Sequence, residues 1–235
     1  MRKILAIISA VGVTACSNAA SVTWTNTVGD SDSTNTANWS PSVAVPGSAD
    51  DIFINTSDTI GNGSGAPWSI RSVTLDSSKT SDITTGVGSL LIGAGGITLG
   101  ANSNLTFNLG VVFNASSAIT LASNSKVAFA TGTDFASNYL VSTNFGSGAT
   151  LTLDNSVQWS NGTMNFTGAV EANSIIVTGG LLDPGTLSKI SINGFSVIQS
   201  SGFIVSAIPE PTTYAALFGA AALGMAAYRK RRVAA

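Results

Sequence analysis

The stretch ITLGANSNLTFNLGVVFNASSAITL, residues 97–121, contains the pattern that decides the fold. It begins and ends with an aliphatic-Thr-aliphatic triplet. Because side chains alternate along a strand, such a triplet places two aliphatic side chains on one face and the Thr on the other. The triplet recurs outward from this stretch at Val73-Thr74-Leu75 and Leu151-Thr152-Leu153, and Ile175-Ile176-Val177 is similar. Successive triplets therefore begin 24, 22, 32 and 24 residues apart.

Three of these four steps fit one coil of a right-handed parallel β-helix, so the chain is predicted to be an all-β solenoid. Stacked coils would form an inner aliphatic column and an outer Thr ladder. The long step predicts an inserted loop within residues 131–148, which contain Phe135, Tyr139 and Phe145. Residues expected to supply positive φ at the coil corners are Gly95, Gly96, Gly100 and Asn102. The alternative is a β-sandwich or jelly roll, in which such triplets recur by chance.

Composition excludes several classes of function. The chain has no His, and its single Cys is Cys16, so Cys or His zinc sites, disulfides within the chain and Ser-His-Asp triads are ruled out. No cofactor is expected. The middle of the chain has four basic residues, Arg71, Lys79, Lys126 and Lys189, against eleven acidic ones, a net charge of -7. A nucleic acid partner is not expected, because this region cannot neutralise a run of phosphates.

The N-terminus has the three parts of a secretory signal peptide, predicted at residues 1–19. Arg2 and Lys3 precede an apolar run that is too short to span a bilayer, and small residues follow it. Cleavage after Ala19 would place small residues at the positions that signal peptidase needs. Val13-Thr14-Ala15-Cys16 also resembles a bacterial lipobox, which would imply lipidation of Cys16.

The C-terminus, residues 207–235, contains three features in order: the triplet Pro209-Glu210-Pro211, the apolar run from Tyr214 to Tyr228, and a basic cluster. The cluster consists of Arg229, Lys230, Arg231 and Arg232. Together they resemble the PEP-CTERM sorting signal of bacteria that also make extracellular polysaccharide. The resemblance implies that an exosortase cuts near the triplet while the protein is transiently held in the inner membrane. The protein would then pass to the cell surface or the extracellular matrix of a Gram-negative-type bacterium.

The physical properties of this segment are consistent with that resemblance. Pro209 and Pro211 hold the backbone extended, so the peptide at Glu210 stays accessible to a protease. The 15-residue apolar run makes about 22 Å of helix, less than the roughly 30 Å hydrocarbon core, so it would need thinned bilayer or snorkelling flanks. The basic cluster should remain cytoplasmic by the positive-inside rule.

The segment Trp24 to Asn55 differs from the repeats that follow. Its Trp24, Asn38-Trp39, Pro46 and Asp51-Ile52 resemble the start of autotransporter-like, repeat-rich surface proteins. A solenoid needs a covered first coil, and two Trp and two Pro suit such a cap. We therefore expect an N-terminal cap at residues 20–69 and the β-solenoid domain at residues 70–206.

Few residues suggest chemistry. Asp30 with Asp32, and Asp50 with Asp51, are the acidic pairs that could contribute to a calcium site, but neither matches a known loop motif, so solvated loop acids and no metal site are expected. The remaining acids are scattered. Aromatic residues that could stack on sugars, or fill the core instead, are Trp24, Trp39, Trp68 and Trp159.

The sequence therefore predicts a non-catalytic structural or adhesive protein associated with exopolysaccharide, with no catalytic residues. The alternative is a carbohydrate-binding module or a polysaccharide lyase on a β-helix. Two or more acids beside an exposed aromatic on one outer face would favour that alternative.

Overall fold

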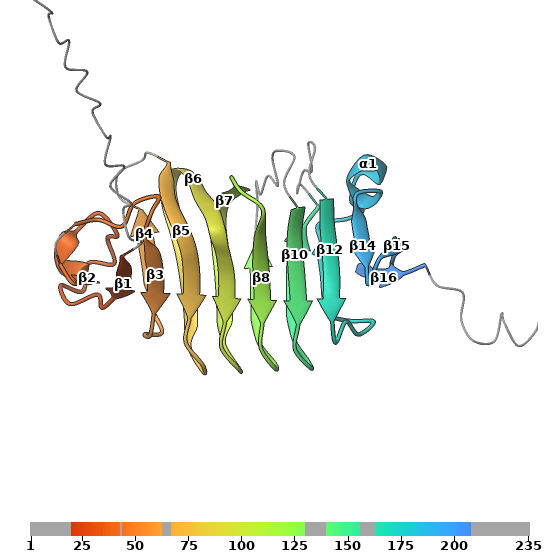
Figure 1. The fold of residues 1–235 in the computed structure, drawn as a ribbon, viewed down its shortest axis with the longest axis horizontal. Coiled ribbons are helices and arrows are strands. Elements are labelled where there is room, and N and C mark those ends of the chain that lie inside the picture. The colour runs from red at the N-terminus through yellow and green to blue at the C-terminus, as the bar shows by residue number, and fades with distance from the viewer. Residues whose placement is uncertain (1–19, 43, 63–66, 130–139, 156–162, 208–235) are drawn as a thin grey trace, which may run out of the picture.

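The computed structural model describes residues 20–42, 44–62, 67–129, 140–155 and 163–207, and within them the chain winds into a stack of β-coils (Figure 1). The successive strands lie side by side along one axis, from β1 near one end to the β14–β16 region at the other. The first part of the chain contains β1 (Ser21–Trp24), η1 (Thr36–Asn38), β2 (Trp39–Ser40), β3 (Asp51–Ile54), β4 (Thr59–Asn62) and β5 (Trp68–Leu75). The central coils contain β6 (Thr80–Leu99), β7 (Asn104–Phe113), β8 (Ser117–Leu121), β9 (Lys126–Phe129), β10 (Leu140–Phe145) and β11 (Thr150–Asp154). The last coils contain β12 (Thr163–Gly168), β13 (Ile175–Thr178), α1 (Pro184–Leu187), β14 (Ile190–Ile192), β15 (Phe195–Ser200) and β16 (Phe203–Ser206).

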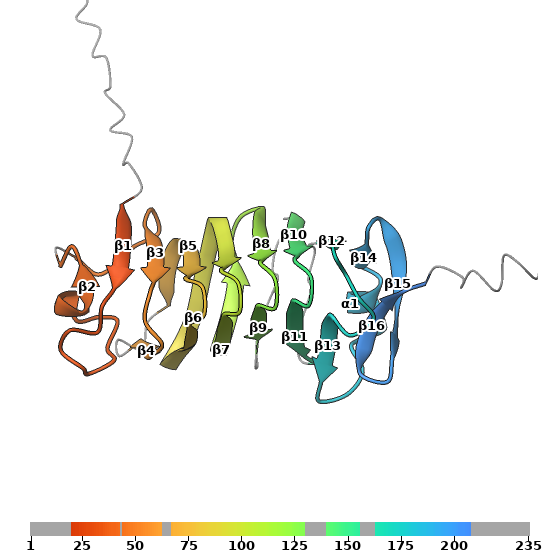
Figure 2. The same cartoon turned by 90° about the horizontal axis from the view of Figure 1, so that it is seen from below.

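The strands form parallel ladders on different sides of the stack (Figure 2). Sheet I contains β1, β3, the end of β5, the end of β6, β8, β10, β12 and β14, each paired in parallel with the next. Sheet II contains β4, the start of β6, the start of β7, β9, β11 and β13, also in parallel. A short sheet III joins the start of β5, the middle of β6 and the end of β7. The predicted parallel β-solenoid is confirmed, and the sandwich and jelly-roll alternatives are wrong because those folds are antiparallel.

The first three triplets stack as the sequence predicts. Val73 pairs with Ile97 and Ile97 with Ile119, while Leu75, Leu99 and Leu121 form a second column in the same register. All six aliphatic side chains are at most 1% exposed. Thr74, Thr98 and Thr120 also pair in register, and they form an outward ladder on sheet I. The inner aliphatic column and the outer Thr ladder are therefore both confirmed for these three coils.

The prediction of an inserted loop within residues 131–148 is wrong where the structure describes it. Phe145 pairs with Leu121, 24 residues earlier, so this coil has ordinary length. Phe145 is also a core residue, 3% exposed, and residues 146–149 are a normal corner. The long step arises because Leu151-Thr152-Leu153 and Ile175-Ile176-Val177 lie on sheet II, not on sheet I. Phe135 and Tyr139 lie outside the described residues.

Sheet I continues through a sequence that breaks the triplet pattern. The position that corresponds to Ile119 on the next coil is Thr143, which is fully buried. Its hydroxyl has no hydrogen-bond partner among the described residues, although its carbonyl accepts a bond from the Thr167 hydroxyl at 3.2 Å. The inner column thus tolerates one buried polar group, whose desolvation costs about 1 to 3 kcal/mol.

On sheet II the inner column is aromatic at its centre. Phe107 and Phe129 pair in register on successive coils, and their rings stack with centroids 5.1 Å apart and planes 5° from parallel. Phe113, from sheet III, meets Phe129 edge-on at 6.4 Å. Equivalent positions on successive coils lie one strand spacing apart, so the same aromatic residue at such positions produces a stack of rings.

The corner between sheets I and II uses the left-handed backbone region. Asn102 and Asn124 occupy it on successive coils, with φ of 57° and 56°, and Nδ2 of Asn124 donates to Oδ1 of Asn102 at 3.3 Å. Positive φ is confirmed for Asn102 and Gly96, but Gly95 and Gly100 do not have it. Gly100 serves a different purpose: a Cβ there would lie 2.5 Å from the backbone nitrogen of Ser77 on the previous coil.

Three tryptophans close the N-terminal end. Trp24 and Trp39 meet edge-to-face with centroids 4.9 Å apart, and Trp68 lies 5.9 Å from Trp39. Their indole nitrogens donate to Asp58 Oδ2, to the Ser33 carbonyl and to the Pro46 carbonyl, at 3.3, 2.8 and 2.9 Å respectively. These rings therefore pack in the core.

The boundaries expected for the signal peptide, cap, solenoid and sorting segment stay predictions.

Leu99→Asp should prevent folding, because an unpaired charge in the inner column costs several kcal/mol against a total stability of about 5 to 15 kcal/mol. The matched change Thr98→Asp, on the exposed Thr ladder one residue away, should lower the melting temperature only slightly. Circular dichroism melts of the two variants test this. Equal sensitivity at the two positions would contradict the assignment of faces.

Candidate functional site at the C-terminal end

The last strands close the C-terminal end of the solenoid by reversing direction. Asn193 and Gly194, then Ser201 and Gly202, have positive φ and form two tight turns. β15 runs antiparallel to β14 of sheet I, and β16 runs antiparallel to both β15 and β13 of sheet II. Sheets I and II therefore each end on an antiparallel partner, which pairs with the last strand of that sheet.

The same elements fix the point at which the C-terminal segment leaves the folded domain. The backbone N–H of Ala207 donates to the carbonyl of Ser196 at 2.9 Å, so the chain remains tied to β15 up to the last described residue. The candidate sorting segment therefore follows β16 with no intervening linker.

A loop and one turn of helix lie beside these strands. Gln199 of β15 accepts from the backbone N–H of Leu182 at 2.8 Å and donates to the carbonyl of Gly180 at 2.9 Å. Asp183 caps α1 by accepting from the N–H of Thr186 at 3.1 Å. A pocket of about 240 Å³ lies between α1 and β15, lined by Leu187, Ile190 and Val197 among others. These bonds hold the loop after β13 against the closing hairpin.

The acidic pairs act as local hydrogen-bond acceptors. Asp30 accepts from the N–H of Asp32 at 3.0 Å and from the amides of Asn35 and Asn38, and these bonds, led by that of Asp32, lower the pKa of Asp30. Asp32 accepts from the N–H and the hydroxyl of Thr34, both at 2.8 Å. Asn38 itself is fully buried. These bonds shape the cap loop around Trp39. Among the described residues, no group of three or more Asp, Glu, His or Cys side chains is arranged to hold a metal ion.

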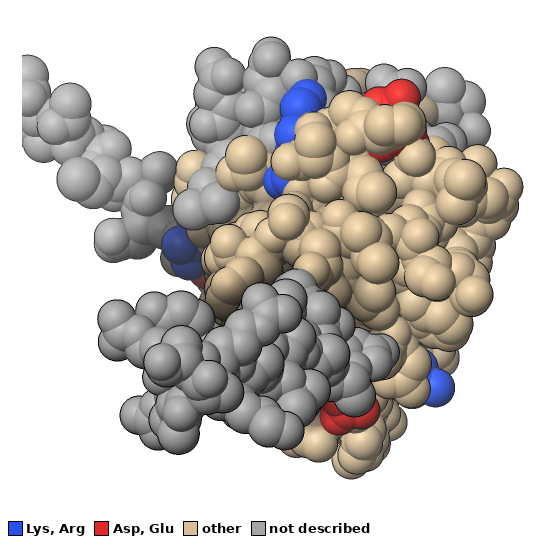
Figure 3. Space-filling view, turned by 90° about the vertical axis from the view of Figure 1, so that its right-hand side faces the viewer, with Lys and Arg blue, Asp and Glu red and all other residues tan. Residues whose placement is uncertain are grey.

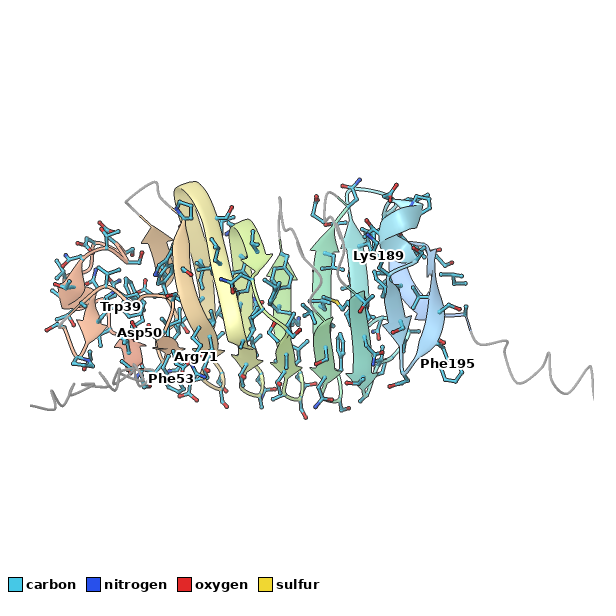
Figure 4. The ribbon with its side chains drawn as sticks, turned by 45° about the horizontal axis from the view of Figure 1, so that its top comes forward. Trp39, Asp50, Phe53, Arg71, Lys189 and Phe195 are labelled. Atoms are coloured by element: carbon cyan, nitrogen blue, oxygen red, sulfur yellow. The ribbon has the colours of Figure 1, made fainter. Side chains whose placement is uncertain are left out.

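The second acidic pair lies where the first coils meet. Asp50 accepts from the N–H of Gly47 at 2.8 Å and from that of Ala20 at 3.3 Å. Asp51 forms an ion pair with Arg71 of the next coil and accepts from the hydroxyl of Ser72. Phe53 follows two residues later on the same outward face of β3 and is half-buried. Figure 4 shows Phe53 and Arg71 on the same side of the first coils. We call Asp51, Phe53, Arg71 and Ser72 the first-coil patch.

The structure places the sequence-predicted residues as follows. Trp24, Trp39 and Trp68 are at most 7% exposed, so their rings are not available for stacking on sugars, and Trp159 lies outside the described residues. The described residues also exclude Cys16, the triplet Pro209-Glu210-Pro211, the apolar run that follows it, and the basic cluster of Arg229, Lys230, Arg231 and Arg232. Their roles stay predictions. Phe53 was missed, because outward-facing aromatics in strands give no signal apart from alternation with Ile52 and Ile54.

The part of the chain that the structure describes contains no helix with the length and apolar character needed to cross a membrane. Residues 207–232 match the PEP-CTERM protein-sorting motif. The motif indicates an exported protein that exosortase processes, with a C-terminus that associates with the membrane in an anchored intermediate, in a bacterium of the Gram-negative type. No curated protein and no solved structure matches this chain. The resemblance of the first segment to autotransporter-like proteins is therefore without support.

The contribution of Asp30 to the stability of the cap can be tested by varying the pH. Its lowered pKa means that the unfolded chain binds a proton more readily than the folded one, so its stabilisation is present above about pH 4 and is lost as the pH falls through the folded pKa. Tryptophan emission of the cap should therefore show an acid transition below about pH 4, and Asp30→Asn should weaken that transition. Asp76→Asn, the same charge change at an exposed corner, is the control. An acid transition that is the same in wild type and Asp30→Asn would contradict the role of Asp30.

Proposed function

We propose that this protein is a non-catalytic structural or adhesive component of the cell surface or extracellular matrix, associated with exopolysaccharide and released there by exosortase. One observation carries the proposal: the sorting motif is joined directly to the closed end of a solenoid. Export would begin with the signal peptide at residues 1–19, and the inner membrane would hold the chain only until it is cut at Pro209-Glu210-Pro211.

The outward face of sheet I supports an adhesive role. Successive coils present Thr74, Thr98, Thr120, Asn144 and Thr167 in one register. Neighbouring positions are about 4.8 Å apart, so the face offers hydroxyl and amide groups at a regular spacing. Each contact with a sugar hydroxyl would be weak, but many contacts along one polymer chain would add through avidity.

The way in which the two acidic pairs, Asp30 with Asp32 and Asp50 with Asp51, are bonded supports a non-catalytic role. Polysaccharide hydrolases need two carboxyl groups facing each other across the scissile bond. Here Asp30 and Asp32 order the cap loop, Asp50 ties Gly47 and Ala20 together, and Asp51 is paired with Arg71. These carboxylates accept hydrogen bonds from nearby backbone and side-chain groups, and so they stabilise the local structure.

The alternative function is specific carbohydrate binding, and the first-coil patch is the observation that favours it. Phe53 shares the outward face of β3 with Asp51, which is paired with Arg71, so this face offers a sugar both an apolar ring and polar partners. Arg71 is 45% exposed in its ion pair, so its donors remain accessible. A binding site there would depend on a few residues, whereas adhesion through the sheet I face would depend on many.

The two functions differ in which variants lose retention by purified exopolysaccharide. We expect Phe53→Ala to leave retention on a polysaccharide column nearly unchanged and the triple variant Thr98→Ala, Thr120→Ala, Asn144→Ala to elute clearly earlier, since the latter removes part of the repeated polar face. The reverse pattern would establish the first-coil patch as a binding site. No retention of the wild type would exclude both adhesion through the sheet I face and binding at the first-coil patch.

Replacement of Pro209-Glu210-Pro211 by three alanines should abolish cleavage, because helix could then extend through the site and close it to the protease. We expect the variant to remain in the inner membrane at full length, as the wild type should in cells without exosortase. The exported wild type should end near residue 208 by mass spectrometry. A surface protein that still ends in Arg231-Arg232-Val233-Ala234-Ala235 would show that the segment is only an anchor.

A further inference from the structure

The outward face of sheet I carries polar side chains with free hydrogen-bonding groups. We call the in-register positions Thr74, Thr98, Thr120, Asn144 and Thr167 the polar column. All five side chains are exposed or half-buried. Within the described part of the chain, the first four make no side-chain hydrogen bond, while the Thr167 hydroxyl donates to the Thr143 carbonyl. Neighbouring coils are about 4.8 Å apart, too far for equivalent hydroxyls to bond each other directly, so these groups are available to a ligand.

This face is uncharged, although the domain as a whole is acidic. β8, β10, β12 and β14 contain no Asp, Glu, Lys or Arg, nor do residues 72–75 of β5 and 96–99 of β6, which belong to the same sheet. Residues 20–206 carry eleven acidic residues against four basic ones. An anionic polymer would therefore be repelled by the domain and would find no cationic side chain on these strands. A neutral ligand meets neither obstacle.

The uncharged face is open toward the C-terminal end of the stack. A second outward column lies beside the polar column and is in register from coil to coil. It consists of Ala118, Ser142, Asn165, Ser191 and Ser196, the last of which is on the closing hairpin. Figure 1 shows β8, β10 and β12 side by side along the stack. Figure 3 looks onto the C-terminal end, where the visible described surface is almost entirely uncharged, with charged side chains toward its margins.

At its other end the face is bounded by the first-coil patch. Asp51 and Phe53 pair with Ser72 and Thr74, so the ion pair of Asp51 with Arg71 lies directly beside the start of the polar column. A neutral polymer on sheet I could therefore run past the last coil, but at the first coil it would meet charged groups.

The polar column determines the direction and the repeat of a matching ligand. Each of its positions belongs to a different coil, so the column crosses the strands and runs along the axis of the stack. The coil spacing of about 4.8 Å is close to the length of one pyranose unit in an extended glycan. Five positions span about 19 Å, which is room for about four or five sugar units.

We propose, on the basis of the adhesive function above, that sheet I binds a neutral, extended polysaccharide that lies along the axis of the solenoid. About one sugar unit faces each coil and exchanges hydrogen bonds with the hydroxyl or amide there. Hydrogen bonds between neutral groups are individually weak, so retention comes from several of them along one polymer chain. Because the contact involves no charged groups, salt has little effect on it.

The first experiment identifies the class of polymer. Exopolysaccharide of the producing bacterium is separated by anion exchange into neutral and acidic fractions, and each fraction is immobilised. The full-length chain, purified in a non-ionic detergent, is then passed over both. We expect the neutral fraction to retain it equally well at low and high salt, and the acidic fraction to retain it weakly or not at all. Equal or stronger retention by the acidic fraction would overturn the polymer class but leave adhesion standing, whereas retention by neither fraction would overturn adhesion as well.

The second experiment locates the contact with two matched double variants. Thr98→Val with Thr120→Val removes two hydroxyls from the polar column. Thr106→Val with Thr152→Val removes two from the outward face of sheet II, where both side chains are half-buried and lie two coils apart in one column. Val keeps the β-branched shape in each case, and circular dichroism melts verify folding.

We expect the sheet I variant to need an about tenfold higher concentration for half-saturation of the neutral fraction, and the sheet II variant to match the wild type. Equal losses in the two variants, or no loss in the sheet I variant, would overturn the assignment to this face. Light scattering covers a second copy as the occupant: a wild-type dimer that the sheet I variant dissociates would also overturn the proposal.

Discussion

A parallel solenoid imposes one constraint on its sequence: each inward side chain must fit beside the side chain at the same position of the next coil, about 4.8 Å away. Ile97 meets this requirement between Val73 and Ile119, and Phe107 meets it by stacking on Phe129. Backbone atoms at the corners approach as closely, which is why a Cβ at Gly100 would collide with Ser77. The hydrogen bonds between coils follow from the same register.

That constraint cannot be met at the two ends, where one neighbour is missing, and each end uses a different solution. At the N-terminus a loop ordered by Asp30 and Asn38 packs Trp39 against Trp24. At the C-terminus the chain turns into the antiparallel hairpin of β15 and β16. The second solution brings Ala207 to the end of the stack and joins the sorting motif directly to it, so the fold determines which end the membrane segment leaves from.

The fold class could be predicted from the triplets, because aliphatic-Thr-aliphatic at coil spacing reflects the column directly. The sheet to which a triplet belongs could not be predicted, since Leu151-Thr152-Leu153 fits the alternation of sheet II as well as that of sheet I. The true continuation on sheet I was missed because Thr143 occupies an inward position that the pattern reserves for an aliphatic residue. The sorting motif was recognisable because its parts are contiguous in sequence, whereas Asp51 and Arg71 come together only after a full coil is wound.

Nitroxide labels on cysteine pairs in a Cys16→Ser background measure the register of the coils directly. We expect labels at Thr120 and Asn144, which lie on adjacent coils with backbones about 5 Å apart, to show strong dipolar broadening. Labels at Thr120 and Thr152 should show none, since sheets packed face to face are about 10 Å apart and the labels point outward from different sheets. Strong broadening for the second pair and none for the first would show that the coils are stacked in a different register.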